Sequence, residues 1–404
     1  MDPLRHVKPA VRELAAYTLA ERPARVKLNQ NENPWDLSEP LKRRVLERAL
    51  ARPWSRYPAF DPHELLSALA GFAGWRADGV LAGNGSNELI EALLVVTVGA
   101  GTRVVIPEPT FTLYALLTKV LGGEAVRVPM PRKAGLVVSD RPAAASLGVF
   151  DQGRQSPNSS AAERSSPLSP RFVYDTEALL EARRASGAAV TIICSPNNPT
   201  GSSLPLDDVE RLCRAGDGLV VIDEAYHEFA GRSVVPLLER HQNLVVLRTF
   251  SKAMALAGLR LGYLLASPAL VREVNKARLP YNVNAFSQLA GLAVIEERAM
   301  LAARVQALVA ERQRLLERLA DVPGVVAHAS DANFFLLELP SADPKAVFDG
   351  LLRRGVLVRD VTSYPQLERC LRISVGSPEE NDDFLHALGA ALTEAGIAVA
   401  GSRA

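Results

Sequence analysis

The sequence has few of the residues that mark disulfide-stapled, metal-binding or nucleic-acid-binding proteins. Three cysteines occur in 404 residues, at Cys194, Cys213 and Cys370, and no two of them form a CxxC pair. This spacing indicates buried thiols of a reducing compartment, so we expect neither disulfides nor a metal site. Lysine plus arginine (46) nearly balance aspartate plus glutamate (45), which leaves a net charge of +1. That balance gives no reason to expect nucleic acid or an anionic membrane as a partner.

Long apolar runs are also missing. None approaches the ~20 residues that a helix needs to cross a bilayer. Residues 1–17 carry charges throughout and lack the apolar core of a signal peptide. The expected location is therefore the cytoplasm. Apolar residues make up 48% and charged residues 23% of the chain, which is ordinary for an enzyme with one large or two medium domains.

What the chain does contain is a series of short, continuous apolar runs. Between residues 81 and 262 these runs alternate with segments of helical periodicity, such as 88–97. Continuous apolar strands that alternate with helices predict an α/β fold with a mostly parallel sheet, covered by helices on both faces. We assign residues 46–284 to this large domain. Its expected strands include 103–108, 189–196, 218–226 and 243–251.

The pattern changes in the last third of the chain. One long helical stretch is expected from about Phe286 to Leu319, followed by strands and helices in mixed order. This mixture predicts a smaller α+β domain over 285–404, against which the N-terminal segment 1–45 would pack. Residues 133–171 are rich in proline, serine and alanine. Such a segment buries too little apolar surface to offset its ordering entropy, so we expect a mobile surface insertion there.

Polar residues follow four of the expected strands. In doubly wound sheets, ligands bind in the crevice outside the carboxyl ends of the strands. We therefore expect these four groups of side chains to meet in one crevice. The groups are 107–111, 195–198, 223–226 and 251–252.

Lys252 and Asp223 together indicate a specific chemistry. Small and apolar residues follow Lys252, and no acidic residue lies near it in sequence. Such a setting lowers the pKa of an amine and makes it a nucleophile toward an aldehyde. Asp223, at a strand end, would hold a ring nitrogen protonated. A lysine and an acidic partner for a pyridinium are the two protein groups that pyridoxal phosphate requires. Taken singly, Lys252 would also fit a solvated surface charge, and Asp223 a helix N-cap.

The phosphate of such a cofactor needs amides, hydroxyls and a fixed cation. The segment GNGSN precedes an expected helix, whose first amides would face an anion at the positive end of the helix dipole. Thr249 and Ser251 offer hydroxyls, and the guanidinium of Arg260 can bind phosphate through two hydrogen bonds. The expected amide donors are Gly85, Ser86 and Asn87.

Three further residues complete the expected cofactor site. Phe111 follows a strand end, where a flat ring would stack on the pyridine, although an ordinary core aromatic fits the same pattern. Asn198 and Tyr226 would both reach the phenolic oxygen of the cofactor.

Three ordered blocks resemble one enzyme family. The blocks SPNNPTG (195–201), DEAYHEF (223–229) and TFSKAMALAGLRLGY (249–263) are similar to the signatures of the class II, fold-type I aminotransferases that depend on pyridoxal phosphate. This resemblance covers nearly the whole chain except the insertion. It implies that Lys252 binds the cofactor aldehyde covalently and that Asp223 and Tyr226 are catalytic.

Further segments resemble the histidinol-phosphate aminotransferases within that family. The segment LNQNENP (28–34), which contains Asn31, is the clearest, and RYP (56–58) and CLRISVG (370–376) agree with it. The subfamily departs from this chain at Met254 and Ala255, where Phe and Gly are usual, and at Asn87, where an acidic residue is frequent. The resemblance implies a set of substrate-binding residues, with Tyr57 reaching in from the neighbouring subunit of a homodimer. The set is Tyr17, Asn31, Tyr57, Asn198, Arg359 and Arg372.

The reaction implied by this resemblance is a transamination in histidine biosynthesis. L-Histidinol phosphate and 2-oxoglutarate would give imidazole-acetol phosphate and L-glutamate. An aromatic or broad-range aminotransferase and a threonine-phosphate decarboxylase of cobalamin synthesis remain alternatives, because substrate scope depends on pocket shape. A non-catalytic sensor on the same fold is a more distant alternative, since no added DNA-binding segment is present.

Overall fold

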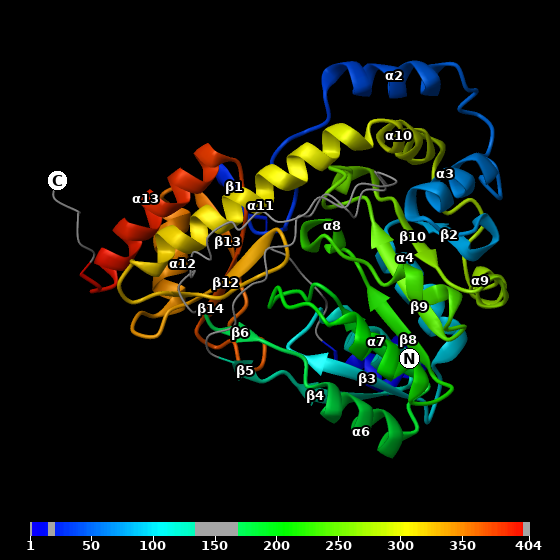
Figure 1. The fold of residues 1–404 in the computed structure, drawn as a ribbon, viewed down its shortest axis with the longest axis horizontal. Helices are drawn as coiled ribbons and strands as arrows, with labels where there is room; N and C mark the ends of the chain where they lie inside the picture. Colours follow the sequence, from blue (N-terminus) through cyan, green and yellow to red (C-terminus); the bar gives the residue numbers. More distant parts are fainter. Residues whose placement is uncertain (1, 15–20, 134–168, 399–404) are drawn as a thin grey trace, which may run out of the picture.

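The computed structural model describes residues 2–14, 21–133 and 169–398. Two β-sheets lie side by side (Figure 1), and the long helix α11 (Arg298–Ala320) extends from the larger sheet region to the smaller. The expectation of an insertion within 133–171 falls almost wholly outside the described residues. At its two ends, strand β5 (Arg132–Lys133) pairs antiparallel with β6 (Arg171–Phe172).

The larger sheet has seven strands in the order β2-β10-β9-β8-β7-β3-β4. Strand β10 is antiparallel to both of its neighbours, and the remaining pairs are parallel. The central strands are mostly apolar and almost fully buried, as a sheet covered on both faces requires, with Thr191, Asp223, Arg248 and Thr249 as polar exceptions. The predicted mostly parallel α/β fold is confirmed. The strands are β2 (Val80–Gly83), β3 (Arg103–Glu108), β4 (Glu124–Pro129), β7 (Val190–Cys194), β8 (Leu219–Asp223), β9 (Leu244–Thr249) and β10 (Gly262–Leu265).

Amphipathic helices cover this sheet. Helix α4 packs its apolar stripe against β9 and β10, and α6 packs against β3 and β4, whereas α2 packs against another helix. Helix α5 ends at Gly122, whose φ of 94° is the left-handed conformation that a glycine adopts without strain. The helices of this part are α2 (Glu39–Leu50), α3 (His63–Ala73), α4 (Ser86–Thr97), α5 (Leu113–Leu121), α6 (Thr176–Ser186), α7 (Leu206–Arg214), α8 (His227–Ala230) and α9 (Pro268–Asn275). The short α1 (Pro9–Arg12) precedes them.

The smaller sheet has five strands in the order β1-β13-β14-β12-β11. Strand β1, from the N-terminal part of the chain, pairs parallel with β13, and the other pairs are antiparallel. Helices α12 (Pro344–Arg353) and α13 (Pro378–Glu394) pack against one another and against β13. The strands are β1 (Val26–Leu28), β11 (Val326–Ala327), β12 (Phe334–Glu338), β13 (Val356–Asp360) and β14 (Cys370–Ser374).

The single long helix expected from Phe286 to Leu319 is divided in two. Helix α10 (Ala285–Glu296) ends and α11 begins at Glu297, whose φ of −100° and ψ of 20° lie outside the α-helical range. The side chains at this break form ion pairs with α2, from Arg44 to Glu297 and from Arg48 to Glu296. Tertiary contacts with α2 therefore accompany a break that the helical periodicity does not reveal.

The cysteines lie apart from one another, and all three are buried, as predicted. Cys370 lies within 4.8 Å of potential metal ligands on His328 and Glu338. The carboxylate of Glu338 is already bound by His328 at 2.9 Å and by Arg132 at 2.9 Å. This cluster fastens β5 to the smaller sheet. No helix among the described segments is both long and apolar enough to cross a membrane.

Candidate active site

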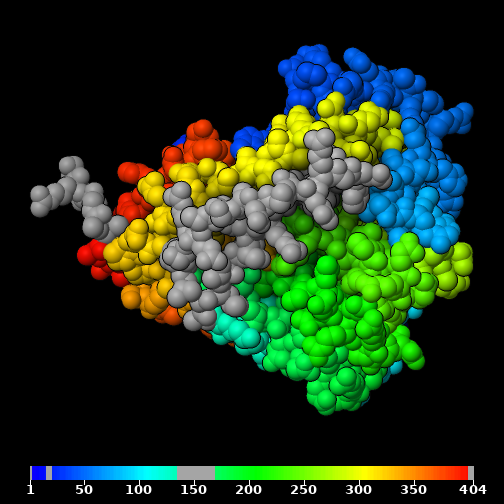
Figure 2. Space-filling model, viewed as in Figure 1, coloured from blue at the N-terminus to red at the C-terminus, as the bar shows by residue number. Residues whose placement is uncertain are grey.

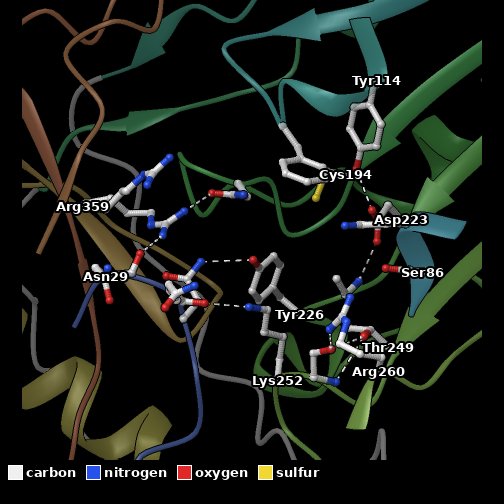
Figure 3. Close-up of a pocket in the computed structure, with 18 of the residues that line it drawn as sticks. Asn29, Ser86, Tyr114, Cys194, Asp223, Tyr226, Thr249, Lys252, Arg260 and Arg359 are labelled. Carbon is white, nitrogen blue, oxygen red and sulfur yellow. Dashed lines mark hydrogen bonds between the residues drawn. The ribbon is translucent and has the colours of Figure 1, made fainter. Parts of the chain in front are cut away.

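A cavity of about 260 Å³ lies at the carboxyl ends of β7, β8 and β9, between the two sheets. Its walls are formed by residues from the ends of the central strands, from the smaller sheet and from the segment after β1 (Figure 3). The expected meeting of strand ends in one crevice is confirmed. The predicted residues that line it are Asn31, Ser86, Asn87, Phe111, Asn198, Asp223, Tyr226, Thr249, Ser251, Lys252, Arg260, Arg359 and Arg372.

Lys252 points into this cavity from the loop after β9. Its Nζ donates a hydrogen bond to the backbone oxygen of Gln30 at 2.7 Å. Burial, and next the positive charge of Arg372, lower the pKa of Lys252 to about 7. At neutral pH a large share of this amine is therefore uncharged, as a nucleophile requires.

Asp223 ends strand β8 and faces the same cavity. Its Oδ2 accepts a hydrogen bond from the Tyr114 hydroxyl at 2.7 Å, and its Oδ1 accepts one from the backbone N–H of Ala225 at 3.1 Å. Burial raises the pKa of Asp223 to about 6, although both hydrogen bonds act in the opposite direction. Among the described residues, no cationic side chain forms an ion pair with Asp223, so this buried carboxylate is suited to pair with a protonated ring nitrogen.

A binding place for an anion lies where α4 begins. Gly85 is the residue before the helix, with a φ of 78°, and no side chain caps the first amides. A Cβ on Gly85 would lie 2.6 Å from Nη2 of Arg260, so the guanidinium lies directly against this turn. Nη1 of Arg260 donates to Oγ of Ser251 at 3.0 Å. Among the described residues, no carboxylate lies within ion-pair distance of Arg260.

Two positive features thus face each other at this point, the guanidinium of Arg260 and the positive end of the α4 dipole. Their proximity is unfavourable unless an anion lies between them. Hydroxyls from Ser251 and Thr249, which are 3.0 Å apart, add donors. A phosphate group meets all of these requirements, so the residues present fit pyridoxal phosphate.

A second positive region lies on the smaller sheet. Arg359 of β13 and Arg372 of β14 are paired in register, and both line the cavity. Nη1 of Arg372 donates to Oδ1 of Asn198 at 2.6 Å, and its Nη2 donates to the backbone oxygen of Asn29 at 2.6 Å. These bonds fix one guanidinium while the other flanks it. Two such groups form a site for a phosphate or a carboxylate.

Asn31 holds Tyr226 in place across the cavity. Its Nδ2 donates to the Tyr226 hydroxyl at 3.1 Å, while its own Oδ1 accepts from Oγ of Ser374 at 2.8 Å. Asn31 has a φ of 55°, a strained conformation for a residue with a side chain. Burial raises the pKa of Tyr226, so the hydroxyl keeps its proton.

Of the predicted residues that the structure describes, Gly85 and Tyr57 do not line the cavity. Gly85 contributes through its position beside Arg260, as described above, and Tyr17 lies outside the described residues. Tyr57 is 80% exposed and stacks on Tyr281 with ring centroids 4.5 Å apart. It lines a separate groove, together with Trp54.

Several lining residues were not predicted from the sequence. Tyr114 is the most informative, because it lies in the first turn of α5, three residues after Phe111, and its backbone N–H donates to the Phe111 oxygen at 3.3 Å. Its ring meets that of Phe111 edge to face, with centroids 5.5 Å apart. The three-residue spacing of these two aromatic residues is the sequence feature that could have indicated Tyr114. The unpredicted residues are Asn29, Gln30, Tyr114, Cys194, Ala225 and Tyr364.

Comparison with known proteins agrees with this geometry. The sequence profile of the aminotransferase class I and II family matches residues 24–137 and 161–388. The chain belongs to this family of pyridoxal-phosphate-dependent aminotransferases.

Within it, the chain is similar to histidinol-phosphate aminotransferases. It is 36% identical to that of Chlorobium phaeovibrioides over 389 residues, which are 96% of this chain and 97% of the relative. It is 35% identical to that of Desulfitobacterium hafniense over 383 residues, covering 95% and 96%.

Solved structures share the fold. The histidinol-phosphate aminotransferase of Sinorhizobium meliloti in complex with pyridoxal-5'-phosphate has a TM-score of 0.78 at 24% identity, covering 96% of this chain and 98% of that one. The L-threonine-O-3-phosphate decarboxylase of Porphyromonas gingivalis has a TM-score of 0.71 at 22% identity, covering 91% and 99%.

Proposed function

We propose that this protein transfers the amino group of L-histidinol phosphate to 2-oxoglutarate, giving imidazole-acetol phosphate and L-glutamate in histidine biosynthesis. One observation carries this proposal. A single cavity joins the amine of Lys252, the carboxylate of Asp223 and two separate positive regions. One positive region suits the cofactor phosphate, and the other suits the anionic end of a substrate. The similarity to histidinol-phosphate aminotransferases over the whole chain supports this choice of substrate.

Pyridoxal phosphate would be held at both ends of its ring. We assign its phosphate to the backbone amides around the start of α4 (Gly85, Ser86 and Asn87), to Thr249 and Ser251, and to Arg260, and its ring to Asp223, Phe111, Asn198 and Tyr226. When bound, this cofactor draws electrons from the α-carbon of an attached amine and stores the amino group between the two half-reactions.

The residues of the chain supply the proton transfer and the charge. The pKa of Lys252 Nζ, about 7, lies close to neutral pH. This amine would take a proton from the substrate α-carbon and return it to the cofactor carbon that is bonded to the transferred nitrogen. Asp223 would supply a negative charge to the ring nitrogen of the bound cofactor. The hydroxyl of Tyr226, fixed by Asn31, stays protonated and would donate to the phenolic oxygen of the cofactor.

The two arginines of the smaller sheet would select the substrates. Histidinol phosphate carries a phosphate and 2-oxoglutarate a second carboxylate, and a pair of guanidinium groups binds either one. We assign this role to Arg359 and Arg372, with Asn198 holding Arg372 and contacting the substrate, and with Tyr17 and Tyr57 assisting. Binding one anion at a time in the same place allows both half-reactions to use one cavity.

An amine-donor panel tests this function against its alternatives. We expect glutamate formation with histidinol phosphate and 2-oxoglutarate to exceed that with phenylalanine or tyrosine by at least about tenfold in kcat/KM, because the arginine pair is matched to a phosphate. Carbon dioxide release from threonine phosphate, without glutamate formation, would identify a decarboxylase instead. Comparable rates with the aromatic donors would identify a broad-range aminotransferase. No turnover with any donor, despite bound cofactor, would favour a sensor.

We further propose that two copies form a dimer through the groove beside Tyr57. Bulky apolar side chains are exposed around it, including Trp54 at 79% and Leu279 at 71%. Exposed aromatics gathered on one face are typical of an interface. Tyr57 lies apart from the cavity of its own chain, which supports a role in the site of a second copy.

We also propose a division of the chain into an N-terminal segment (1–45), a large domain (46–284) and a small domain (285–404). The pairing of β1 with β13 supports the packing of the N-terminal segment with the small domain.

Subunit mixing tests the shared site. Neither Lys252→Ala nor Tyr57→Ala should be active alone at more than a small fraction of the wild-type rate. Hybrid dimers formed after mixing contain one site with both native residues, so we expect about a quarter of the wild-type activity to return at equal amounts. A monomer by sedimentation, or no recovery in a mixture shown to exchange subunits, would contradict the shared site.

A further inference from the structure

Tyr114 lies between two groups that would contact the cofactor ring. It is fully buried, and it connects helix α5 to the end of strand β8. On one side its hydroxyl donates to Oδ2 of Asp223 at 2.7 Å. On the other side its ring meets that of Phe111 edge to face, with an interplanar angle of 89°. Figure 3 shows the hydroxyl of Tyr114 directed at Asp223.

The direction of this hydrogen bond is fixed. Burial, followed by the charge of Asp223, raises the pKa of Tyr114 well above its usual value, so the hydroxyl keeps its proton and donates it. The other oxygen of Asp223 is held by the backbone N–H of Ala225. With both oxygens held, the carboxylate has one orientation in the cavity.

We propose that Tyr114 is a positioning residue that orients both ring-contacting groups at once, the carboxylate of Asp223 and the aromatic face of Phe111. This inference rests on the proposed function only as far as cofactor binding and does not depend on which amine is the substrate. A single rigid side chain thereby sets the distance between the charge partner and the stacking partner of the ring. Preorganisation of this kind raises affinity because no ordering remains to be done on binding.

Other groups around Asp223 do not replace this contact. Glu224 is the neighbouring negative charge, and it is paired with Arg248 at 2.9 Å. The thiol of Cys194 and the hydroxyls of Tyr174 and Tyr226 are affected by the charge of Asp223, and all three keep their protons because burial raises each pKa. The Tyr174 hydroxyl donates to the backbone oxygen of Cys194 instead. Among the described side chains, the one that donates a hydrogen bond to Asp223 is Tyr114.

The test compares two substitutions at Tyr114 by their affinity for pyridoxal phosphate. Tyr114→Phe keeps the ring contact with Phe111 and removes the hydroxyl, and we expect the Kd of the cofactor to rise by roughly 10-fold, since a hydrogen bond to a charged group is lost. Tyr114→Leu also removes the aromatic contact, which should add roughly 2- to 10-fold. Quenching of intrinsic fluorescence during titration of the cofactor-free protein measures both values.

A second readout reports on Asp223 itself. In the cofactor-free protein, Tyr114→Phe should move the titration of Asp223 from about 6 to a higher pH, because a hydrogen bond that stabilises the carboxylate is removed. Infrared spectra of protein labelled at the aspartate carboxyl group follow this titration, with Asp223→Asn used to assign the band. If Tyr114 had only a structural role, its substitution would leave the titration of Asp223 unchanged.

Tyr263→Phe is the matched control. Tyr263 is equally buried, its hydroxyl lies 3.4 Å from Arg248, and it does not line the cavity. Its substitution should leave the cofactor Kd within about twofold of the wild-type value. That change is much smaller than the one expected when Tyr114→Phe removes the hydrogen bond to Asp223. An unchanged Kd and titration in Tyr114→Phe, or an equal loss in Tyr263→Phe, would overturn the proposal. Equal Kd values in Tyr114→Phe and Tyr114→Leu would overturn the part of the proposal in which Tyr114 orients Phe111. Replacement of Tyr114 by 3-fluorotyrosine keeps the hydroxyl, so cofactor binding should be close to that of the wild type. This variant provides the comparison if Tyr114→Phe or Tyr114→Leu does not fold.

Discussion

Lys252→Ala is expected to lower kcat with histidinol phosphate and 2-oxoglutarate by roughly 10⁴-fold, the upper range for loss of a positioned acid–base group. Lys252 is the one lysine among the described residues that line the cavity. Under the proposed function its amine is both the attachment point for the cofactor and the carrier of the proton, so we expect no neighbour to compensate for its loss. Steady-state glutamate formation measures the rate, and the visible absorbance of the bound cofactor should shift in parallel.

Lys276→Ala is the control for the loss of a lysine. This side chain is 68% exposed and pairs with Glu273 on the surface of α9, so its loss should leave kcat unchanged. Wild-type turnover in Lys252→Ala would remove the basis of the whole assignment. Lys252→Arg keeps the charge but not a titratable amine and should be nearly as inactive as the alanine variant, since a guanidinium stays protonated.

The strands of the large domain could be anticipated in part. Strands β7, β8 and β9 are mostly apolar runs, because a strand buried on both faces needs apolar residues at most positions, and only Thr191 and Arg248 are polar within them before the strand ends. Strand β10 gave no such signal, since it has four residues and owes its antiparallel place to pairing with β2 and β9. The division between α10 and α11 was equally hidden, because neither glycine nor proline lies at the junction around Glu297.

Residues at strand ends were the predictable part of the site. Their position follows from the fold class alone, since the carboxyl ends of parallel strands share one edge. Asn29 and Gln30 were not predictable in this way. Gln30 lies 222 residues from Lys252 in sequence, and their contact depends on how the smaller sheet packs against the larger one. Tyr114 was not predictable from the strand ends either, because it lies in the first turn of α5 and its contact with Asp223, 109 residues away in sequence, depends on how that helix packs on the sheet.

Asp223→Asn is the second substitution with a large expected effect. An amide of the same shape still accepts from the N–H of Ala225, but it carries no charge to keep a ring nitrogen protonated. We expect kcat to fall by roughly 10³-fold, comparable to the loss of one preorganised electrostatic group in other active sites. Single-turnover kinetics of the first half-reaction measure the effect. Asp217→Asn is the control, because Asp217 is an exposed residue just before the other end of the same strand.

The same substitution should have the opposite effect on the stability of the cofactor-free protein. Burial raises the pKa of Asp223 from 3.8 to about 6, so the folded state holds its proton more tightly than the unfolded state does. Ionised Asp223 therefore destabilises the fold above pH 6, and this cost disappears as the pH falls toward 3.8. Cofactor-free Asp223→Asn should melt at a higher temperature than the wild type at pH 8 and at an equal temperature near pH 4. A lower Tm at pH 8 would show that Tyr114 and Ala225 more than offset the burial of the charge. The expected pattern instead means that the protein keeps an unfavourable buried carboxylate because the cofactor ring neutralises it on binding.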